Sequence, residues 1–186
     1  MPPKIKITKE EIVSAAVEIV RSSGEQALNA RTVAAALNCS TQPVFSNFAA
    51  MEDLRQAVVH AADALCREYL QREVECGPHP PYKASGMAYI RFAKEEKELF
   101  KLLYMRDRSQ EIIPEATDIG NRMEEMVTGN TGLQPSEAKL FHLEMWAYVH
   151  GIAAMTATGY LDLDWALVSR MLTDAYQSLR KQFEKE

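Results

Sequence analysis

The sequence predicts an all-α protein with a small three-helix N-terminal domain over residues 1–50 and a larger helical domain over residues 51–186. Three observations support this class. Apolar residues recur at i, i+3, i+4 and i+7 along most of the chain, helix-starting and helix-ending residues flank those stretches, and no alternating strand pattern of useful length occurs. Apolar residues make up 47% of the chain, which is enough to build a core.

Composition narrows the class of protein further. No apolar run approaches the roughly 20 residues that span a bilayer, and residues 1–6 lack the apolar stretch of a signal peptide. We therefore expect a cytoplasmic protein with no membrane partner, which suits three cysteines without a disulfide pattern. The net charge is −5, yet the first 50 residues hold five cations against four anions. An N-terminal domain with so little net charge can still bind DNA at close range, but it attracts DNA only weakly over long distances.

The first expected helix runs from Thr8 to Gly24. Thr8 and Glu11 have the T-x-x-E spacing of a capping box, and Gly24 stands where a helix-ending residue is expected. The apolar face of this helix consists of Ile12, Ala15, Ala16, Ile19 and Val20.

Two shorter helices are expected next. Asn29 is a good N-cap for the second helix, which ends before a turn at Asn38, where asparagine tolerates the left-handed conformation. We expect Ser40 to cap the third helix, which runs through about Asn47. Pro43 falls in its first turn, where a missing N–H group costs little.

A long helix is predicted from Met51 to Cys76, and the Gly/Pro cluster at residues 77–81 ends it. Further helices are expected over residues 82–95, 97–106, 113–129, 135–158 and 163–184.

Residues 29–48 have the pattern of a helix-turn-helix, in which two short helices pack closely around a turn. Small alanines at positions 34, 35 and 36 permit that close crossing. The expected inward residues are Val33, Leu37, Val44 and Phe48. An ordinary helical hairpin is the alternative interpretation of this segment alone.

A wider set of residues matches a known pattern in order and spacing: Gly24, Asn29 to Ala34, Ser40, Phe45, Phe48 and Met51 to Leu54. On these residues, positions 8–55 resemble, without a gap, the DNA-binding domain of the tetracycline-repressor (TetR) family. In the larger part, W-A-Y-V-H-G-I-A-A-M at Trp146–Met155 is similar to the tryptophan–histidine–glycine helix of one class of that family. Arg91–Ala93 followed by Glu98–Phe100 resembles the middle-helix pattern of the same class.

This resemblance implies a ligand-responsive transcriptional regulator, a repressor by the family's common mode of action. It implies a homodimer that binds a palindromic operator and is released by a small, mostly apolar effector. Three departures stand out, because many members carry a tyrosine at Phe45, a basic residue or a histidine near Ser46 or Asn47, and a lysine at Met51, groups that commonly contact phosphates. The alternative is therefore an all-helical ligand-binding or adaptor protein with weak or lost DNA binding.

The expected DNA-binding residues are Arg31, Ser40, Thr41, Gln42, Pro43, Phe45, Ser46 and Asn47. Residues at the start of a recognition helix lie nearest the base edges. Gln42 can pair with adenine through two hydrogen bonds, and Thr41 or Pro43 can touch a thymine methyl group. Arg31 is a candidate phosphate contact, as is Lys9, although a solvated surface cation is the alternative for each.

The expected helices over residues 135–158 and 163–184 each have an apolar face, which we call a seam. In a dimer, these two helices can pack against the same two helices of the second copy as a four-helix bundle. The expected dimer residues are Phe141, Met145, Tyr148, Ile152, Trp165, Val168, Leu172 and Leu179. The alternative is that both seams close the core of a monomer.

The larger domain also holds the expected effector pocket, lined by large or flexible apolar groups with a few polar tips. Its residues are Tyr89, Phe92, Phe100, Leu103, Tyr104, Met123, Met126, Trp146 and His150. Taken singly, each of these residues fits plain core equally well.

An enzyme is the main rival from another class. Cys66, Cys76 and His79 have a C-x9-C-x2-H spacing that matches no usual zinc site, and no fourth ligand is evident. Nucleophile, phosphate-loop and metalloprotease motifs are missing from the sequence. We therefore expect no catalysis, no metal and no cofactor.

Overall fold

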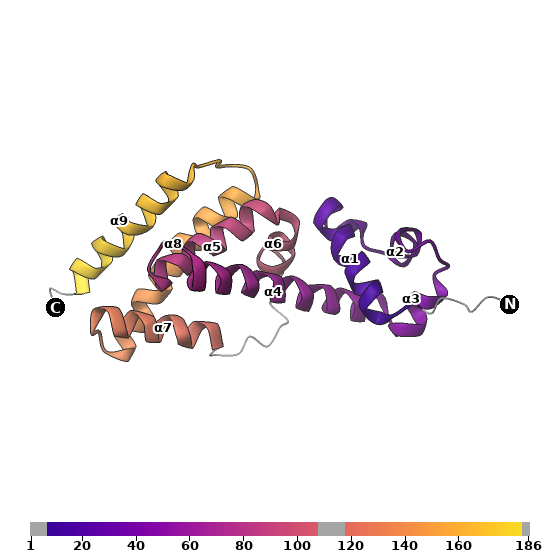
Figure 1. Ribbon diagram of the computed structural model, residues 1–186, viewed down its shortest axis with the longest axis horizontal. Coiled ribbons are helices and arrows are strands. Elements are labelled where there is room, and N and C mark those ends of the chain that lie inside the picture. The colour runs from indigo at the N-terminus through magenta and orange to yellow at the C-terminus, as the bar shows by residue number, and fades with distance from the viewer. Residues whose placement is uncertain (1–6, 108–117, 184–186) are drawn as a thin grey trace. The chain divides into compact units, whose positions relative to one another are not determined.

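The computed structural model describes residues 7–107 and 118–183, and Figure 1 shows the order of their elements. Every regular element in those residues is a helix, which confirms the predicted all-α class. The chain divides into two compact units. Unit 1 comprises Met1–Cys66 and Glu96–Arg106, and unit 2 comprises Arg67–Glu95 and Asp107–Glu186. Unit 1 therefore extends beyond the domain boundary placed after residue 50.

Helix α1 (Lys9–Ser23) has the predicted ends. The Thr8 amide donates to Glu11 Oε2 at 2.8 Å, and the Glu11 amide donates to Thr8 Oγ1 at 3.1 Å. Gly24 has φ of +80°, a conformation that favours glycine, and its amide donates to the Val20 carbonyl at 2.8 Å. Local sequence chemistry thus fixes where α1 begins and ends.

A short 3₁₀ helix, η1 (Glu25–Ala27), leads into α2 (Ala30–Ala36). The Asn29 side chain caps α2 by accepting from the amides of Arg31 and Thr32 at 3.0 and 3.1 Å. Asn38 adopts φ of +50°, which confirms the predicted left-handed turn.

Helix α3 (Gln42–Asn47) begins one residue later than the sequence suggested. Ser40 is not its N-cap, because the cap position belongs to Thr41, whose side chain makes no capping hydrogen bond. Ser40 still belongs to the turn between α2 and α3, in which the Cys39 amide donates to the Ala34 carbonyl at 2.9 Å. Pro43 lies in the first turn of α3, as predicted.

Unit 1 has its own apolar core, in which α1 packs against η1, α2 and α6 (Lys97–Tyr104). Helix α4 (Met51–Cys76) has the predicted bounds and begins in this unit. Side chains with no exposed surface include Ile12, Val20, Val33, Val44, Leu54, Leu99 and Phe100. Of the three alanines expected at the helix crossing, only Ala34 is buried, whereas Ala35 and Ala36 face solvent.

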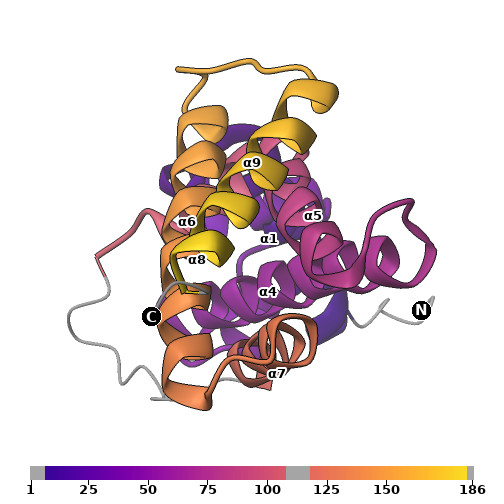
Figure 2. The ribbon, with the colours of Figure 1, turned by 90° about the vertical axis from the view of Figure 1, so that its left-hand side faces the viewer.

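Unit 2 contains α5 (Pro81–Glu95), α7 (Asp118–Thr131), α8 (Pro135–Ala157) and α9 (Trp165–Phe183). Figure 2 shows α5, α8 and α9 gathered side by side, and each of the three packs against the other two. Gly86 lets them approach closely, since a Cβ atom there would lie 3.3 Å from Leu172 and 3.5 Å from Val149. A second cluster, around Phe141 on α8, packs against the end of α9.

Within the described ranges, no helix is both long enough and apolar enough to cross a membrane.

Candidate nucleic-acid interface and effector site

Helix α3 has one face turned into unit 1 and one turned to solvent. Val44 and Phe48 are buried and anchor the helix. Gln42, Phe45 and Ser46 are exposed, and Phe45 shows 52% of its surface. These three occupy i, i+3 and i+4 positions, so they lie on one side of the helix.

The polar side chains of this helix differ in what they bind. Ser46 Oγ donates to the Gln42 carbonyl at 2.9 Å, and Asn47 Nδ2 donates to the Pro43 carbonyl at 2.8 Å. Both side chains therefore turn back to their own helix. The Gln42 side-chain amide forms no hydrogen bond with any residue that the structure describes. It is the α3 side chain best placed to bond to something outside the protein.

The other predicted DNA-binding residues lie on α2 and on the turn before α3. Arg31 is exposed and forms no ion pair with another described residue. Ser40 is exposed, and Thr41 and Pro43 are half-buried. Arg31 and the α3 face thus combine an exposed cation with an exposed neutral surface in the same unit.

Lys9 has a structural contact that the sequence did not suggest. Its ammonium nitrogen lies 5.0 Å from the centre of the Phe48 ring, a cation–π arrangement. The contact ties the start of α1 to the residue that follows α3.

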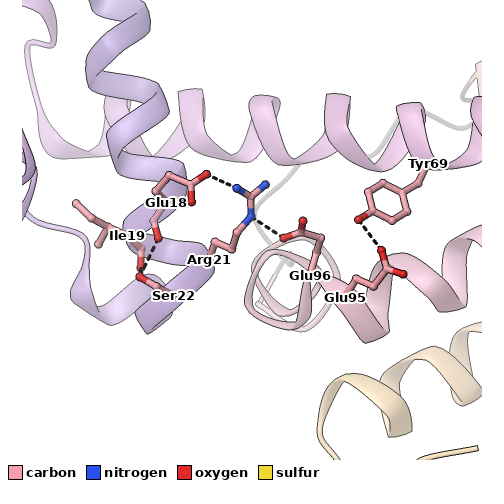
Figure 3. Close-up of polar contacts among 7 residues, drawn as sticks. All are labelled: Glu18, Ile19, Arg21, Ser22, Tyr69, Glu95 and Glu96. Carbon is pink, nitrogen blue, oxygen red and sulfur yellow. Dashed lines mark hydrogen bonds and ion pairs between the residues drawn. The ribbon is translucent and has the colours of Figure 1, made fainter.

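Helices α1 and α6 are joined by an ion pair, drawn in Figure 3. Arg21, in the last turn of α1, donates through Nε to Glu96 Oε2 at 2.7 Å. Glu96 is the residue before α6, and its side chain is only 13% exposed. Arg21 also pairs with Glu18 of its own helix, whose side chain is far more exposed. The Glu96 contact is therefore the more shielded of the two.

The carboxylate of the preceding residue, Glu95, has its partner in unit 2. Glu95, the last residue of α5, accepts a hydrogen bond from the Tyr69 hydroxyl at 2.9 Å, also visible in Figure 3. Tyr69 in turn packs edge-on against Phe92, with ring centres 5.5 Å apart. Two consecutive glutamates thus hold partners in different units.

In unit 2, three predicted pocket residues are in direct contact. The Tyr89 hydroxyl and His150 Nδ1 share a hydrogen bond of 3.0 Å between α5 and α8. Trp146 stacks on the His150 ring, with ring centres 5.2 Å apart and planes 20° apart. Burial lowers the pKa of His150, so its imidazole is neutral at pH 7. Trp146 remains 46% exposed, which leaves this cluster open on one side.

The remaining predicted pocket residues are distributed between the units. Met123 accepts a weak hydrogen bond from Ser85 Oγ at 3.4 Å, and Met126 is half-buried. Phe92 is fully buried in unit 2. Three members, Phe100, Leu103 and Tyr104, belong to α6 of unit 1.

The predicted dimer seam lies largely on the inward side of α8 and α9. Five of its eight residues are buried in the chain's own core: Phe141, Met145, Ile152, Val168 and Leu172. Trp165 and Leu179 are half-buried, and Tyr148 is exposed.

A different apolar strip faces outward on α8. Leu140, Leu143 and Ala147 follow i, i+3 and i+7 spacing, and the two leucines are 50% and 49% exposed. A Cβ atom at Gly151, one turn further on, would meet nothing within 4 Å. We call Leu140, Leu143, Ala147 and Gly151 the outer α8 strip. Because α8 is apolar around most of its circumference, sequence periodicity did not distinguish this strip from the buried face.

Comparison with known families gives one decisive match. Residues 82–175 match the family model for the tetracyclin repressor-like C-terminal domain. The matched segment is 94 of the 186 residues, just over half of the chain. The chain belongs to the tetracyclin repressor-like (TetR) family. The matched range begins in α5 and ends in α9, so it lies on the helices that hold the Tyr89–His150–Trp146 cluster and the outer α8 strip.

Solved structures of two TetR-family regulators and of a multidrug binding protein have the same fold. A TetR-like transcriptional regulator from Rhodococcus sp. RHA1 is 14% identical with a TM-score of 0.64, over 98% of this chain and 97% of that one. A TetR family protein from Vibrio parahaemolyticus is 14% identical with a TM-score of 0.61, over 91% and 96%. The multidrug binding protein EbrR, solved with imidazole, is 18% identical with a TM-score of 0.56, over 90% and 88%. Comparison with curated proteins gave no match.

For this TetR-family chain, sequence reasoning missed the residues whose role depends on distant contacts. Arg21 and Glu96 are 75 positions apart, and no local pattern pairs them. The outer α8 strip carried a usable signal, since Leu140, Leu143 and Ala147 have helical spacing, but the opposite face had it as well.

Proposed function

We propose that this TetR-family protein is a ligand-responsive transcriptional repressor that binds a palindromic operator as a homodimer. The exposed face of α3 is the single observation that carries this proposal. A helix-turn-helix reads DNA with the outward residues of its second helix, and here that helix is anchored by buried Val44 and Phe48. Its outward amide, Gln42, has no partner among the described residues.

Within this proposal, the predicted DNA-binding residues have distinct roles. Gln42 pairs with an adenine edge, which offers one acceptor and one donor to match a side-chain amide. Arg31, exposed and without an ion pair in the described part of the chain, binds a phosphate. The uncharged hydroxyl groups of Ser40 and Thr41 donate hydrogen bonds to the DNA backbone. These bonds replace the phosphate contacts that a tyrosine at 45 and a lysine at 51 provide in many relatives.

A second copy of the chain is the proposed occupant of the outer α8 strip. A two-fold dimer needs a self-complementary apolar patch, and Leu140 and Leu143 present half of their surface to solvent in the single chain. Leu167 of α9 is also 42% exposed. Tyr148 is the member of the originally predicted seam that remains accessible for such a contact.

The proposed effector site is built on Tyr89, His150 and Trp146. A neutral imidazole, a hydroxyl and an open indole face suit a small, mostly apolar molecule with one polar group. Together with Gly151, the Trp146 and His150 side chains support membership of the tryptophan–histidine–glycine class that the sequence resembles.

Release of DNA requires that the effector favour a state in which the two recognition helices no longer fit successive major grooves. The coupling cannot exceed the effector's differential affinity for the two states, typically about 1–3 kcal/mol. Any displacement of α6 acts on α1 through Arg21 and Glu96, both in unit 1.

Selection of bound sequences from genomic or random DNA by the purified protein tests this function. A repressor of this type should enrich a roughly palindromic site whose half-sites are spaced by whole helical turns, about 34–36 Å each. Failure to enrich any sequence at low salt would instead favour a helical ligand-binding or adaptor protein without DNA binding.

A further inference from the structure

We propose that this helix-turn-helix reads A·T base pairs, with Phe45 as a base-reading residue beside Gln42, and that no side chain of its two helices beyond Arg31 recognises guanine or cytosine. The proposal rests on the function proposed above, because it assumes that α3 enters the major groove. It goes further by assigning a base composition to the half-site and a role to the exposed ring of Phe45.

The first step is the absence of charge. Residues 32–51 include no Asp, Glu, Lys, Arg or His, a run of 20 residues that covers nearly all of α2, the turn and α3. Guanine is read most often by an arginine or lysine that donates to its two acceptors, and cytosine by an acidic acceptor. Neither type of side chain occurs in the run, so direct readout of a G·C pair lacks its usual partners.

The second step is the chemistry that the outward face does offer. Gln42 and Phe45 are three residues apart on one side of α3, which places their Cβ atoms about 5–6 Å from each other. Gln42 presents a donor and an acceptor, the complement of adenine N7 and N6. Phe45 lacks the hydroxyl with which a tyrosine at this position reaches a phosphate in many relatives, so its ring offers only apolar contacts. In the major groove the apolar group available to it is the thymine C5-methyl.

The third step separates these two residues from their neighbours. Ser46 and Asn47 each donate to a carbonyl of α3 itself, at 2.9 and 2.8 Å. Gln42 has no such bond among the described residues, and Phe45 is 52% exposed although it is the most apolar group on that face. The exposed Phe45 ring can bury its apolar surface against a thymine methyl group, and the Gln42 amide can bond to the adenine of an A·T pair. The two side chains together therefore suit A·T pairs.

Single-atom changes in the DNA test the two contacts separately. The full-length protein is first used to select its operator, and binding is then measured on that operator with deoxyuridine for thymidine, which deletes the methyl group, or with 7-deazaadenine, which deletes N7. Deoxyuridine at the contacted position should weaken the wild-type protein about fourfold for each methyl group removed and leave Phe45→Ala unaffected. Removing the amide in Gln42→Ala should cost between about 5- and 150-fold, and 7-deazaadenine should then add nothing.

Matched controls keep the result interpretable. Tyr160→Ala removes an aromatic ring that is 78% exposed outside the helix-turn-helix, and it should retain the wild-type sensitivity to both modified bases. Phe45→Leu keeps an apolar side chain and should retain part of the methyl sensitivity. Gln42→Arg should move the preference at its position toward guanine.

The outcomes distinguish this inference from the proposed function. If no DNA sequence is enriched, the proposed function is wrong, and the inference is wrong as well because it depends on that function. If a palindromic site is enriched but G·C pairs dominate the positions under α3, or if deoxyuridine affects wild type and Phe45→Ala equally, the function stands and the inference is overturned.

Discussion

Arg21 Nε lies 2.7 Å from Glu96 Oε2, and this ion pair joins the last turn of α1 to the residue that precedes α6. Arg21 is 34% exposed and Glu96 13%, so the pair is partly shielded from water. A partly buried charged hydrogen bond has a more defined geometry than a surface pair, which typically contributes about 0–1 kcal/mol. The helix that supports the DNA-binding face is therefore fixed to α6 by a specific contact.

Replacing Glu96 tests that contact. Glu96→Gln keeps an acceptor for Arg21 but removes the charge, and we expect the free energy of unfolding to fall by about 1 kcal/mol in urea titrations. Hydrogen exchange should quicken in the last turn of α1 and the first turn of α6. Glu18→Gln is the control, because it removes the exposed partner of the same arginine and should cost less than about 0.5 kcal/mol. Equal effects of the two variants would mean that the Glu96 contact has no special role.

The outer α8 strip predicts how the protein assembles. Light scattering of the unmodified protein should give about 42 kDa, twice the 20.9 kDa chain. Leu143→Glu places a charge on the exposed strip, so we expect a folded monomer with an unchanged helical circular dichroism spectrum. Leu172→Glu places the same charge in the buried core, where an unpaired carboxylate is costly, and it should unfold the chain.

Two results would count against this face. A wild-type monomer at tens of micromolar would remove the dimer altogether. A Leu143→Glu variant that remains dimeric would place the interface elsewhere.

The sequence predicted the local elements well because their signals are local. Thr8 and Glu11 supply both halves of a capping box, and Asn38 occupies the left-handed position that few other residues tolerate. The sequence did not show which face of α8 is buried. Apolar residues cover both sides of that helix, and only the packing of α5, α7 and α9 determines that Phe141 is buried and Leu143 exposed.

Long-range polar contacts were outside the reach of sequence patterns for the same reason. Lys9 was a candidate phosphate contact, yet its ammonium group lies over Phe48, 39 positions away. Arg21 had no assigned role until its partner across 75 positions was visible. Pairing of this kind depends on how helices cross, and the spacing of residues along one helix does not encode it.

The effector site can be tested with Trp146 as its own reporter. The chain has two tryptophans, so Trp165→Phe leaves Trp146, stacked on His150, as the sole indole. In that background, small apolar compounds that weaken DNA binding should change the indole fluorescence.

Tyr89→Phe is the matching variant, because it deletes only the hydroxyl bonded to His150. Its response to the same compounds should weaken at a cost in stability of about 1 kcal/mol. Compounds that release DNA without any change at Trp146 would place the effector site elsewhere.

The turn between α2 and α3 predicts a strict preference at position 38. With φ of +50°, Asn38→Gly should be neutral or slightly stabilising, whereas Asn38→Val should cost about 1–2 kcal/mol. DNA affinity should fall in Asn38→Val, because the turn sets the direction of α3. Ala36→Val, on the exposed end of α2, introduces the same side chain with a propensity cost of only about 0.5 kcal/mol. Similar thermal unfolding curves for the two valine variants would contradict this account of the turn.

The most direct test of DNA recognition compares Gln42→Ala and Arg31→Ala on the selected operator and on scrambled DNA at two salt concentrations. Gln42→Ala should weaken operator binding by about 1–3 kcal/mol for each bidentate pair that it removes and leave binding to scrambled DNA almost unchanged. Arg31→Ala should weaken both DNAs alike and lower the salt slope by about 0.9 for each phosphate that the protein no longer neutralises. If Gln42→Ala weakens both DNAs equally and Arg31→Ala leaves the salt slope unchanged, neither residue binds DNA as proposed and the central claim is wrong.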